Sequence, residues 1–94
     1  MIGSFKDRTT RRIFDGEKVG RLERPIYDRA RRKLQQLEAA TRIEDLYFPP
    51  SNRLHPLQGY TPTRYSIWIN EQWHISFEWL EDKAEGVLFE DCHR

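Results

Sequence analysis

The stretch RYSIWINEQWHISFEW, residues 64–79, decides the fold of this chain. Large apolar residues alternate with polar ones along it, which is typical of strands with one buried face. A three-residue turn, Asn70-Glu71-Gln72, separates the two alternating runs and is the length that keeps both apolar sets on the same side. The residues of that apolar side are Tyr65, Ile67, Ile69, Trp73, Ile75, Phe77 and Trp79. The stretch therefore predicts an antiparallel β-hairpin with one core face.

The same turn length predicts which residues meet on the polar face of the hairpin. It pairs Ile69 with Trp73, and it then sets Trp68 opposite His74 and Arg64 opposite Glu78. A third strand is expected near 84–91, after a tight turn at Glu81-Asp82-Lys83. We therefore expect a meander whose polar face is open and holds Trp68 and His74 side by side.

The first half of the chain favours helices. Residues 4–14 form a charged stretch with a few apolar positions, and Gly16 follows as a stop signal. Pro25 suits the first turn of a second helix. Apolar residues recur at helical spacing after it, at Ile26, Ala30, Leu34 and Leu37. Helices followed by an antiparallel meander predict a single α+β domain, 1–94, with two N-terminal helices packed on a twisted sheet.

The opposite side of the second helix is basic. It carries Arg29, Arg32 and Lys33 together with Gln36. Such a side is often simply solvated, but it also suits RNA phosphates or an acidic partner. The charge of the whole chain has the same bias, since residues 1–50 hold 12 Lys/Arg against 8 Asp/Glu (+4) and residues 51–94 hold 4 against 7 (−3), which sum to the net +1.

The connector 43–63 holds four prolines, which exclude a continuous helix. Its apolar residues predict that it packs onto the domain. A single cysteine excludes an internal disulfide and fits a reducing cytosol. The polar N-terminus and the absence of a long apolar run predict a cytoplasmic chain with no signal peptide and no membrane segment.

Three histidines carry the candidate chemistry: His55 in the connector, His74 on the hairpin and His93 in the terminal FEDCHR. Asp91 and Cys92 lie beside His93, but their spacing matches no structural zinc pattern. A metal-free ribonuclease site needs a base for the ribose 2′-OH, a donor for the phosphorane and an acid for the leaving 5′-oxygen. Histidine suits the acid and base roles because its ordinary pKa is about 6.5. These residues alone leave open a catalytic, a metal-binding or a purely structural role.

Five ordered segments resemble the HigB branch of the RelE/ParE toxin superfamily. MIGSFKDRTTRRIF resembles its opening MI-x-SF-x-(K/D) helix, and RARRKLQQLEAAT resembles its second helix. PPSNRLHPLQG is similar to P-x-NRL-x-x-L-x-G. YSIWINEQWHISFEW is similar to YSIRINDQWRI-x-F-x-W, and FEDCHR to a terminal VDYH. The resemblance covers nearly the whole chain.

The resemblance implies the same α+β fold and a toxin of a type II toxin–antitoxin system. Such toxins cleave mRNA in the ribosomal A site without a metal or other cofactor, and 2′-OH attack leaves a 2′,3′-cyclic phosphate. The implied partner is HigA, a helix-turn-helix antitoxin. Two alternatives stay open: a weakly active member that mainly binds antitoxin and ribosome, and a ParE-like inhibitor of DNA gyrase.

The resemblance also implies roles for single residues. His55 matches the connector histidine of some members, and Asp91 and His93 match the tail aspartate and histidine. We expect His55 and His93 to act as acid and base and Asp91 to orient one of them. Arg53, the arginine of NRL, is expected either to contact RNA or to form a structural salt bridge.

Three positions depart from the resembled pattern. His74 and Trp68 stand where the family has arginines, and Cys92 stands where it has tyrosine. Histidine replaces the permanently charged, bidentate arginine only in part. Single catalytic donors are worth about 10²–10³ in rate, so these changes predict weakened cleavage. Trp68 offers instead a face on which an RNA base can stack.

Overall fold

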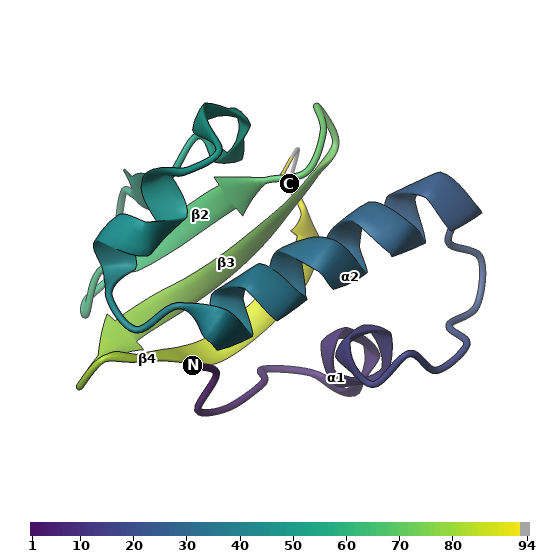
Figure 1. The fold of residues 1–94 in the computed structure, drawn as a ribbon, viewed down its shortest axis with the longest axis horizontal. Helices are drawn as coiled ribbons and strands as arrows, with labels where there is room; N and C mark the ends of the chain where they lie inside the picture. Colours follow the sequence, from purple (N-terminus) through teal and green to yellow (C-terminus); the bar gives the residue numbers. More distant parts are fainter. Residues whose placement is uncertain (93–94) are drawn as a thin grey trace.

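A computed structural model describes residues 1–92 of the chain and confirms the predicted α+β fold (Figure 1). Two α-helices come first, followed by two short 3-10 helices (η) and four strands. Their bounds are α1 Arg8–Phe14, α2 Arg24–Ala39, η1 Ile43–Tyr47, η2 Pro50–Asn52, β1 His55–Leu57, β2 Arg64–Trp68, β3 Trp73–Leu80 and β4 Lys83–Asp91.

The strands form one antiparallel sheet in the order β1-β2-β3-β4. The predicted register is confirmed, because Trp68 pairs with His74 and Arg64 with Glu78. The Ile69 N–H donates to the Trp73 carbonyl at 3.0 Å and closes the three-residue turn. The Asn70 side chain stabilises this turn by accepting from the N–H groups of residues 72 and 73.

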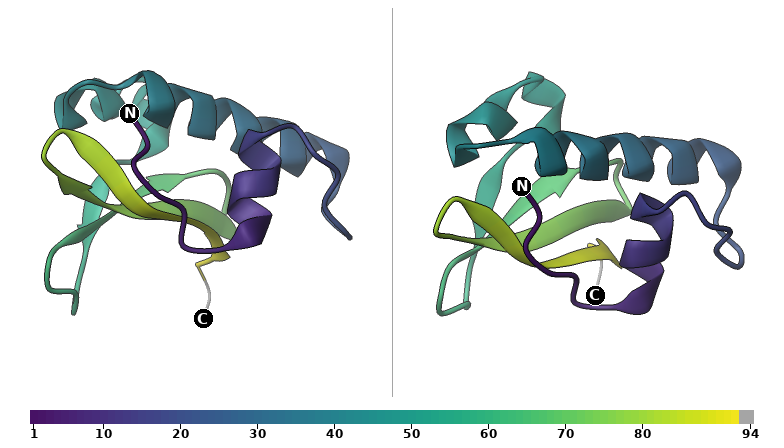
Figure 2. Two further views of the ribbon diagram at one scale, coloured as in Figure 1. Left: turned by 90° about the horizontal axis from the view of Figure 1, so that it is seen from below. Right: turned by 60° about the horizontal axis from the view of Figure 1, so that its bottom comes forward.

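The helices cover one face of the sheet (Figure 2). Ile67, Ile75 and Phe77 on this face are fully buried against helical side chains such as Ile13 and Leu34. Burial of large aliphatic and aromatic side chains is the main stabilising term of such a fold, at about 1.5–3 kcal/mol each. Among the described helices, none is long and apolar enough to cross a membrane.

The predicted helix over residues 4–14 is wrong at its beginning, because α1 starts at Arg8. Asp7 caps α1 by accepting from the Thr10 N–H at 2.8 Å, and the chain before it is extended. Ile2 and Phe5 bridge to Ala84 and Val87 in parallel pairs along β4. The backbone groups of this outer strand thus find partners, which protects the sheet edge.

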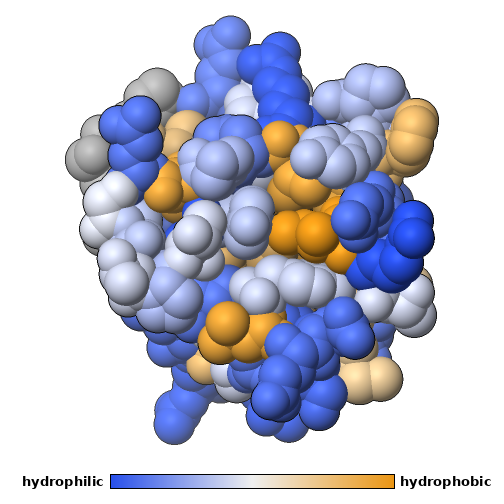
Figure 3. All heavy atoms as spheres, turned by 90° about the vertical axis from the view of Figure 1, so that its left-hand side faces the viewer, coloured by the Kyte–Doolittle hydropathy of each residue, from blue (hydrophilic) through white to orange (hydrophobic). Residues whose placement is uncertain are grey.

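The connector is more regular than predicted. It forms the two 3-10 helices and β1, whose His55 pairs with Ser66 of β2. These elements were not predicted. Strand β1 was missed because a three-residue strand that contains a proline has no alternating pattern to detect. This side of the molecule is largely hydrophilic, with hydrophobic patches of limited extent (Figure 3).

The last turn is one residue shorter than predicted. Leu80 and Lys83 are paired, so β4 begins at Lys83 and only Glu81 and Asp82 form the turn. Both turn residues have positive φ, 52° and 66°. Two successive left-handed residues make the tight turn that matches the twist of a hairpin.

The polar face of the sheet is not open as predicted. Arg64, Ser66 and Ser76 on this face are 4%, 1% and 0% exposed. The loop between β1 and β2 extends below the sheet, on the side away from the helices (Figure 2). The ring of Tyr60 in this loop faces the Arg64 guanidinium at 6.0 Å. The loop therefore covers part of the polar face, and a cleft stays open beside Tyr60.

Candidate active site

A chain of hydrogen bonds crosses the polar layer and ends at His74. The His74 Nε2 lies 3.1 Å from Glu90 Oε2. The Ser76 hydroxyl donates to the same oxygen at 2.7 Å, and Arg64 Nη2 donates to the Ser76 hydroxyl at 3.0 Å. Arg64 also donates to the Gly86 carbonyl at 2.8 Å. The His74 side chain is therefore fixed by hydrogen bonding, and 12% of it is exposed.

His74 opens into a cleft of about 410 Å³ on the side of the sheet away from the helices. The cleft is lined by Leu57, Gln58, Tyr60, His74, Glu90, Asp91 and Cys92. The structure thus brings together three of the predicted site residues, from β3 and from the end of β4. Hydrogen-bonding side chains that converge on a cleft are typical of a ligand site.

Cys92 anchors the end of β4 to the hairpin turn. Its N–H donates to the Gln72 carbonyl at 2.7 Å, and its thiol contacts the carbonyls of residues 71 and 72 at 3.2 and 3.1 Å. The Gln72 amide donates to Asp91 at 3.2 Å. These contacts fix Asp91 at the mouth of the cleft.

His55 lies on β1 and is exposed. Its Nδ1 is 2.6 Å from the Arg53 carbonyl. A carbonyl only accepts, so Nδ1 carries the proton and Nε2 of the neutral ring is left as an acceptor. The Arg53 guanidinium stacks on the Trp68 ring at 4.2 Å, and Trp68 is the cross-strand partner of His74. His55 is not among the residues that line the His74 cleft, so the structure does not bring these two histidines together in one cleft.

A second cleft, of about 510 Å³, lies between α2 and β2. Its lining residues are Arg29, Arg32, Lys33, Gln36, Ser51, Trp68 and Ile69. The predicted basic side of the helix therefore faces a cleft that shares Trp68 with the polar layer. Arg29 donates to the Ile69 carbonyl at 3.0 Å, and Lys33 donates to the Asn52 side chain. Both contacts hold the cations along the wall of this cleft.

The electrostatics of the basic cleft are visible at Lys33. Burial lowers the pKa of the Lys33 ammonium from its ordinary value, and the neighbouring charges of Arg29 and Arg32 lower it further. Three cations held this close repel one another. A bound anion would relieve that repulsion, so the cleft suits a phosphate group.

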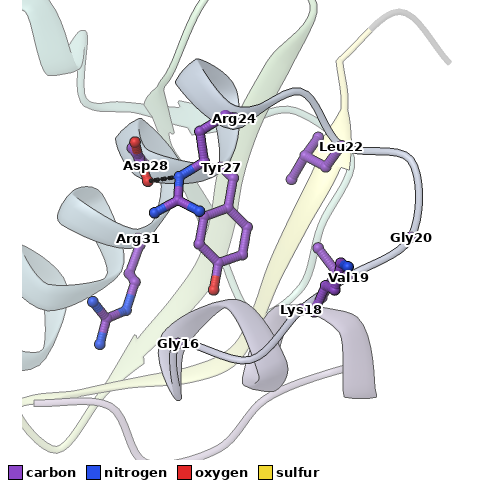
Figure 4. A pocket seen from close by; sticks show the side chains of 9 residues that line it. All are labelled: Gly16, Lys18, Val19, Gly20, Leu22, Arg24, Tyr27, Asp28 and Arg31. Carbon is purple, nitrogen blue, oxygen red and sulfur yellow. Dashed lines mark ion pairs between the residues drawn. The ribbon is translucent and has the colours of Figure 1, made fainter.

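A third cleft, of about 450 Å³, lies on the helical side of the molecule (Figure 4). Tyr27 reaches from α2 towards the segment after α1, and its hydroxyl donates to the Glu17 carbonyl at 2.8 Å. Arg24 pairs with Asp28 at 3.1 Å. The nine lining residues include none of the predicted site residues and no histidine or cysteine. This cleft is separate from the candidate site.

Among residues 1–92, no group of three or more His, Cys, Asp and Glu side chains is placed to hold a metal ion. The predicted catalytic residue His93 lies outside the described residues, so its role stays a prediction. The sequence did not single out Glu90, Ser76 or Arg64 as site residues. The register of the third strand was the missing signal, because it places Glu90 opposite His74.

Comparison with known proteins agrees with this architecture. A model of the family of HigB-like, RelE-like toxins of type II toxin–antitoxin systems matches residues 3–93. The chain is 35% identical over 95 residues to Toxin HigB-1 of Vibrio cholerae, covering 100% of this chain and 99% of that protein. It is 30% identical over 93 residues to Endoribonuclease HigB of Proteus vulgaris, covering 99% and 100%. The chain belongs to the family of HigB-like toxins of type II toxin–antitoxin systems.

Proposed function

We propose that this toxin is a metal-independent endoribonuclease that cleaves mRNA on the ribosome. The observation that carries the proposal is the pair of neighbouring clefts, one with His74 and Asp91 and one with three basic side chains, with Trp68 between them. The name of the Proteus vulgaris relative, Endoribonuclease HigB, supports the activity.

The reaction proceeds in one displacement at phosphorus. A base removes the proton of the ribose 2′-OH, the 2′-oxygen bonds to phosphorus, and the bond to the 5′-oxygen breaks. An acid protonates that leaving oxygen, which gives a 2′,3′-cyclic phosphate and a 5′-OH end. The neutral His55 ring has a free Nε2 for proton abstraction. We assign the acid to His93, the second histidine for which the family resemblance predicts acid–base work, and Asp91 orients one of the two histidines.

Within the basic cleft, substrate binding is divided between a nucleobase on Trp68 and phosphates on the cations. The Trp68 ring stacks on an RNA base, and Arg53 on its face adds a cation beside the backbone. Arg29, Arg32 and Lys33 bind phosphates of the same strand in the basic cleft. In the absence of two arginines of the resembled pattern, these groups supply the positive charge that holds the message.

The family implies an antitoxin partner for this toxin. We propose that the partner is a HigA-type helix-turn-helix protein and that the ribosomal A site presents the mRNA. These assignments place the toxin in the cytoplasm, where translating ribosomes are. An adjacent gene for a small helix-turn-helix protein, and co-purification of its product with the toxin, test the first assignment.

Inducing the toxin in bacteria and mapping mRNA 5′ ends tests the activity. Wild-type protein should generate new 5′-OH ends within translated messages, whereas His55→Ala, His93→Ala and Asp91→Asn should remove most of them. Toxin that has been stripped of metal with EDTA and then returned to ribosomes in magnesium buffer should cleave as fast as untreated toxin. Accumulation of folded wild-type protein without new ends would refute the proposal.

A further inference from the structure

We propose that Glu90 is a positioning residue for His74 in the RNA-cleaving reaction. Glu90 accepts the Nε2–H of His74, holds the imidazole in this orientation and leaves Nδ1 as the ring nitrogen that faces substrate. This inference rests on the proposed function, but the orientation of His74 can be tested without it.

The direction of each hydrogen bond supports this role. Arg64 can only donate, so the Ser76 oxygen accepts from it at 3.0 Å and the Ser76 proton is free to point to Glu90. Ser76 donates to Glu90 Oε2 at 2.7 Å. An ionised carboxylate only accepts, so His74 must donate to the same oxygen through Nε2. The tautomer of the neutral His74 ring is thus fixed by a chain that starts at Arg64.

Burial makes this chain rigid. Arg64 and Ser76 are 4% and 0% exposed, and the side chains of His74 and Glu90 are 12% and 17% exposed. Arg64 is further held by Glu78 at 3.7 Å and by the Gly86 carbonyl. Polar groups in such surroundings are costly to leave unpaired, so alternative rotamers of His74 and Glu90 are disfavoured.

Residues 74 and 90 both differ from the resembled pattern, and the two differences suit each other. His74 stands where the resembled family has arginine, and Glu90 stands where its terminal VDYH has valine. An arginine needs no partner to fix a tautomer, because every guanidinium nitrogen is a donor. A histidine does need one, and outer partners of this kind typically change activity by about 10–100-fold when removed.

A double-mutant cycle tests the proposal on cleavage. Glu90→Val should lower kcat by about 10–100-fold when residue 74 is histidine. In the His74→Arg background the same change should cause no loss, because the arginine does not depend on Glu90. Equal losses in both backgrounds would assign Glu90 to general stability of the polar layer and would overturn the proposal.

The orientation of His74 has a separate readout. The chain has three histidines, so the ring ¹⁵N signals of His74 can be assigned as those missing from His74→Arg. At alkaline pH, wild-type protein should show neutral His74 protonated at Nε2, and Glu90→Val should show a mixture of tautomers. A wild-type ring protonated at Nδ1 would overturn the proposal.

Glu85→Val is the matched control. Glu85 lies on the same strand and also accepts from a serine, Ser4, at 2.8 Å, but Ser4 lies outside the chain of hydrogen bonds that runs from Arg64 to His74. This variant should leave the tautomer of His74 unchanged and should change cleavage equally in both backgrounds. If wild-type protein cleaves no RNA, the proposed function fails, and the ¹⁵N measurement alone decides whether Glu90 positions His74.

Discussion

The pKa of Lys33 reports directly on the electrostatics of the basic cleft. Its lowered pKa means that the ammonium is less favourable in the folded chain than in the unfolded chain. The folded state therefore carries a penalty at neutral pH, which is relieved as the pH rises through the folded pKa towards the ordinary value of about 10.4. An anionic ligand would offset the repulsion of Lys33 by Arg29 and Arg32, so the cleft around Lys33 suits such a ligand.

Titration of ¹³Cε signals should show Lys33 losing its proton below the ordinary lysine pKa, because burial and the charges of Arg29 and Arg32 lower its pKa. Addition of a short single-stranded RNA should shift the Lys33 titration to higher pH, since phosphates stabilise the charged form. The exposed Lys83 at the β-turn serves as the internal control. A Lys33 titration that stays at the ordinary lysine pKa and does not respond to RNA would contradict this description of the cleft.

Trp68 lines the basic cleft and is the strand partner of His74, and its replacement should affect substrate binding more than the chemical step. Trp68→Ala should weaken RNA binding by about 1–3 kcal/mol, the usual worth of one base stack, and Trp68→Phe should retain part of it. Steady-state cleavage on ribosomes should show the loss mainly in KM. Tyr47→Ala, at an aromatic side chain that is 58% exposed, provides the control. A fall in kcat alone would place Trp68 outside substrate binding.

At the scale of single residues, the sequence predicted the pairing of Trp68 with His74 but missed Glu90. The pairing of Trp68 with His74 followed from the length of the turn between them, which the sequence shows. The second depended on how β4 aligns with β3, where the pairing shifts between Ser76 and Glu78. Gly86, with φ 59°, lies at this irregularity. A bulge moves every residue beyond it by one position, and no periodic pattern reveals where it occurs.

Strands β2 and β3 contribute two buried serines that are directly opposite each other and differ in their hydrogen bonds. Ser76 links Arg64 to Glu90, whereas the Ser66 hydroxyl has no partner among the described residues. Ser76→Ala should lower the free energy of unfolding by about 1–3 kcal/mol, because Arg64 and Glu90 each lose one of their hydrogen-bond partners in a largely buried layer. Ser66→Ala should be neutral or stabilising, because it removes an unpaired buried hydroxyl.

Urea unfolding of the two variants decides between these expectations. The pair is closely matched, since the residue type, the burial and the sheet face are the same. Equal destabilisation by both changes would mean that the serine contacts do not contribute to stability in the way the geometry indicates.

Whole elements were predicted wherever a period was long enough to be recognised. The stripe on α2 and the alternation in β2 and β3 each span several repeats. Strand β1 and the bridges of Ile2 and Phe5 to β4 were missed, because they depend on partners distant in sequence. Such segments become extended through the neighbour they pair with, so their own residues carry little signal.

Over the whole molecule, the two halves of the chain contribute opposite charges to two different clefts. The helical half supplies the cations of the basic cleft, and the sheet half supplies the carboxylates Glu90 and Asp91 beside His74. RNA bound across Trp68 would thus have its phosphates held at one end and its reacting ribose at the other. This arrangement predicts that electrostatics governs binding, while the histidine cleft governs the chemical step.

The salt dependence of RNA binding tests this division of roles. The triple variant Arg29→Gln, Arg32→Gln, Lys33→Gln removes three phosphate contacts, and each contact to single-stranded RNA contributes about 0.7 to the slope of log K against log salt concentration. The slope should therefore fall by about 2 when measured by fluorescence anisotropy with a short RNA. Lys18→Gln, Arg21→Gln, Arg24→Gln removes the same charge elsewhere, from two residues that line the cleft of Figure 4, Lys18 and Arg24, and from the neighbouring Arg21, and should leave the slope nearly unchanged. Equal reductions in both variants would show that only the net charge of the protein attracts RNA. A loss confined to the variant of Arg29, Arg32 and Lys33 would locate the RNA strand between this side of α2 and Trp68.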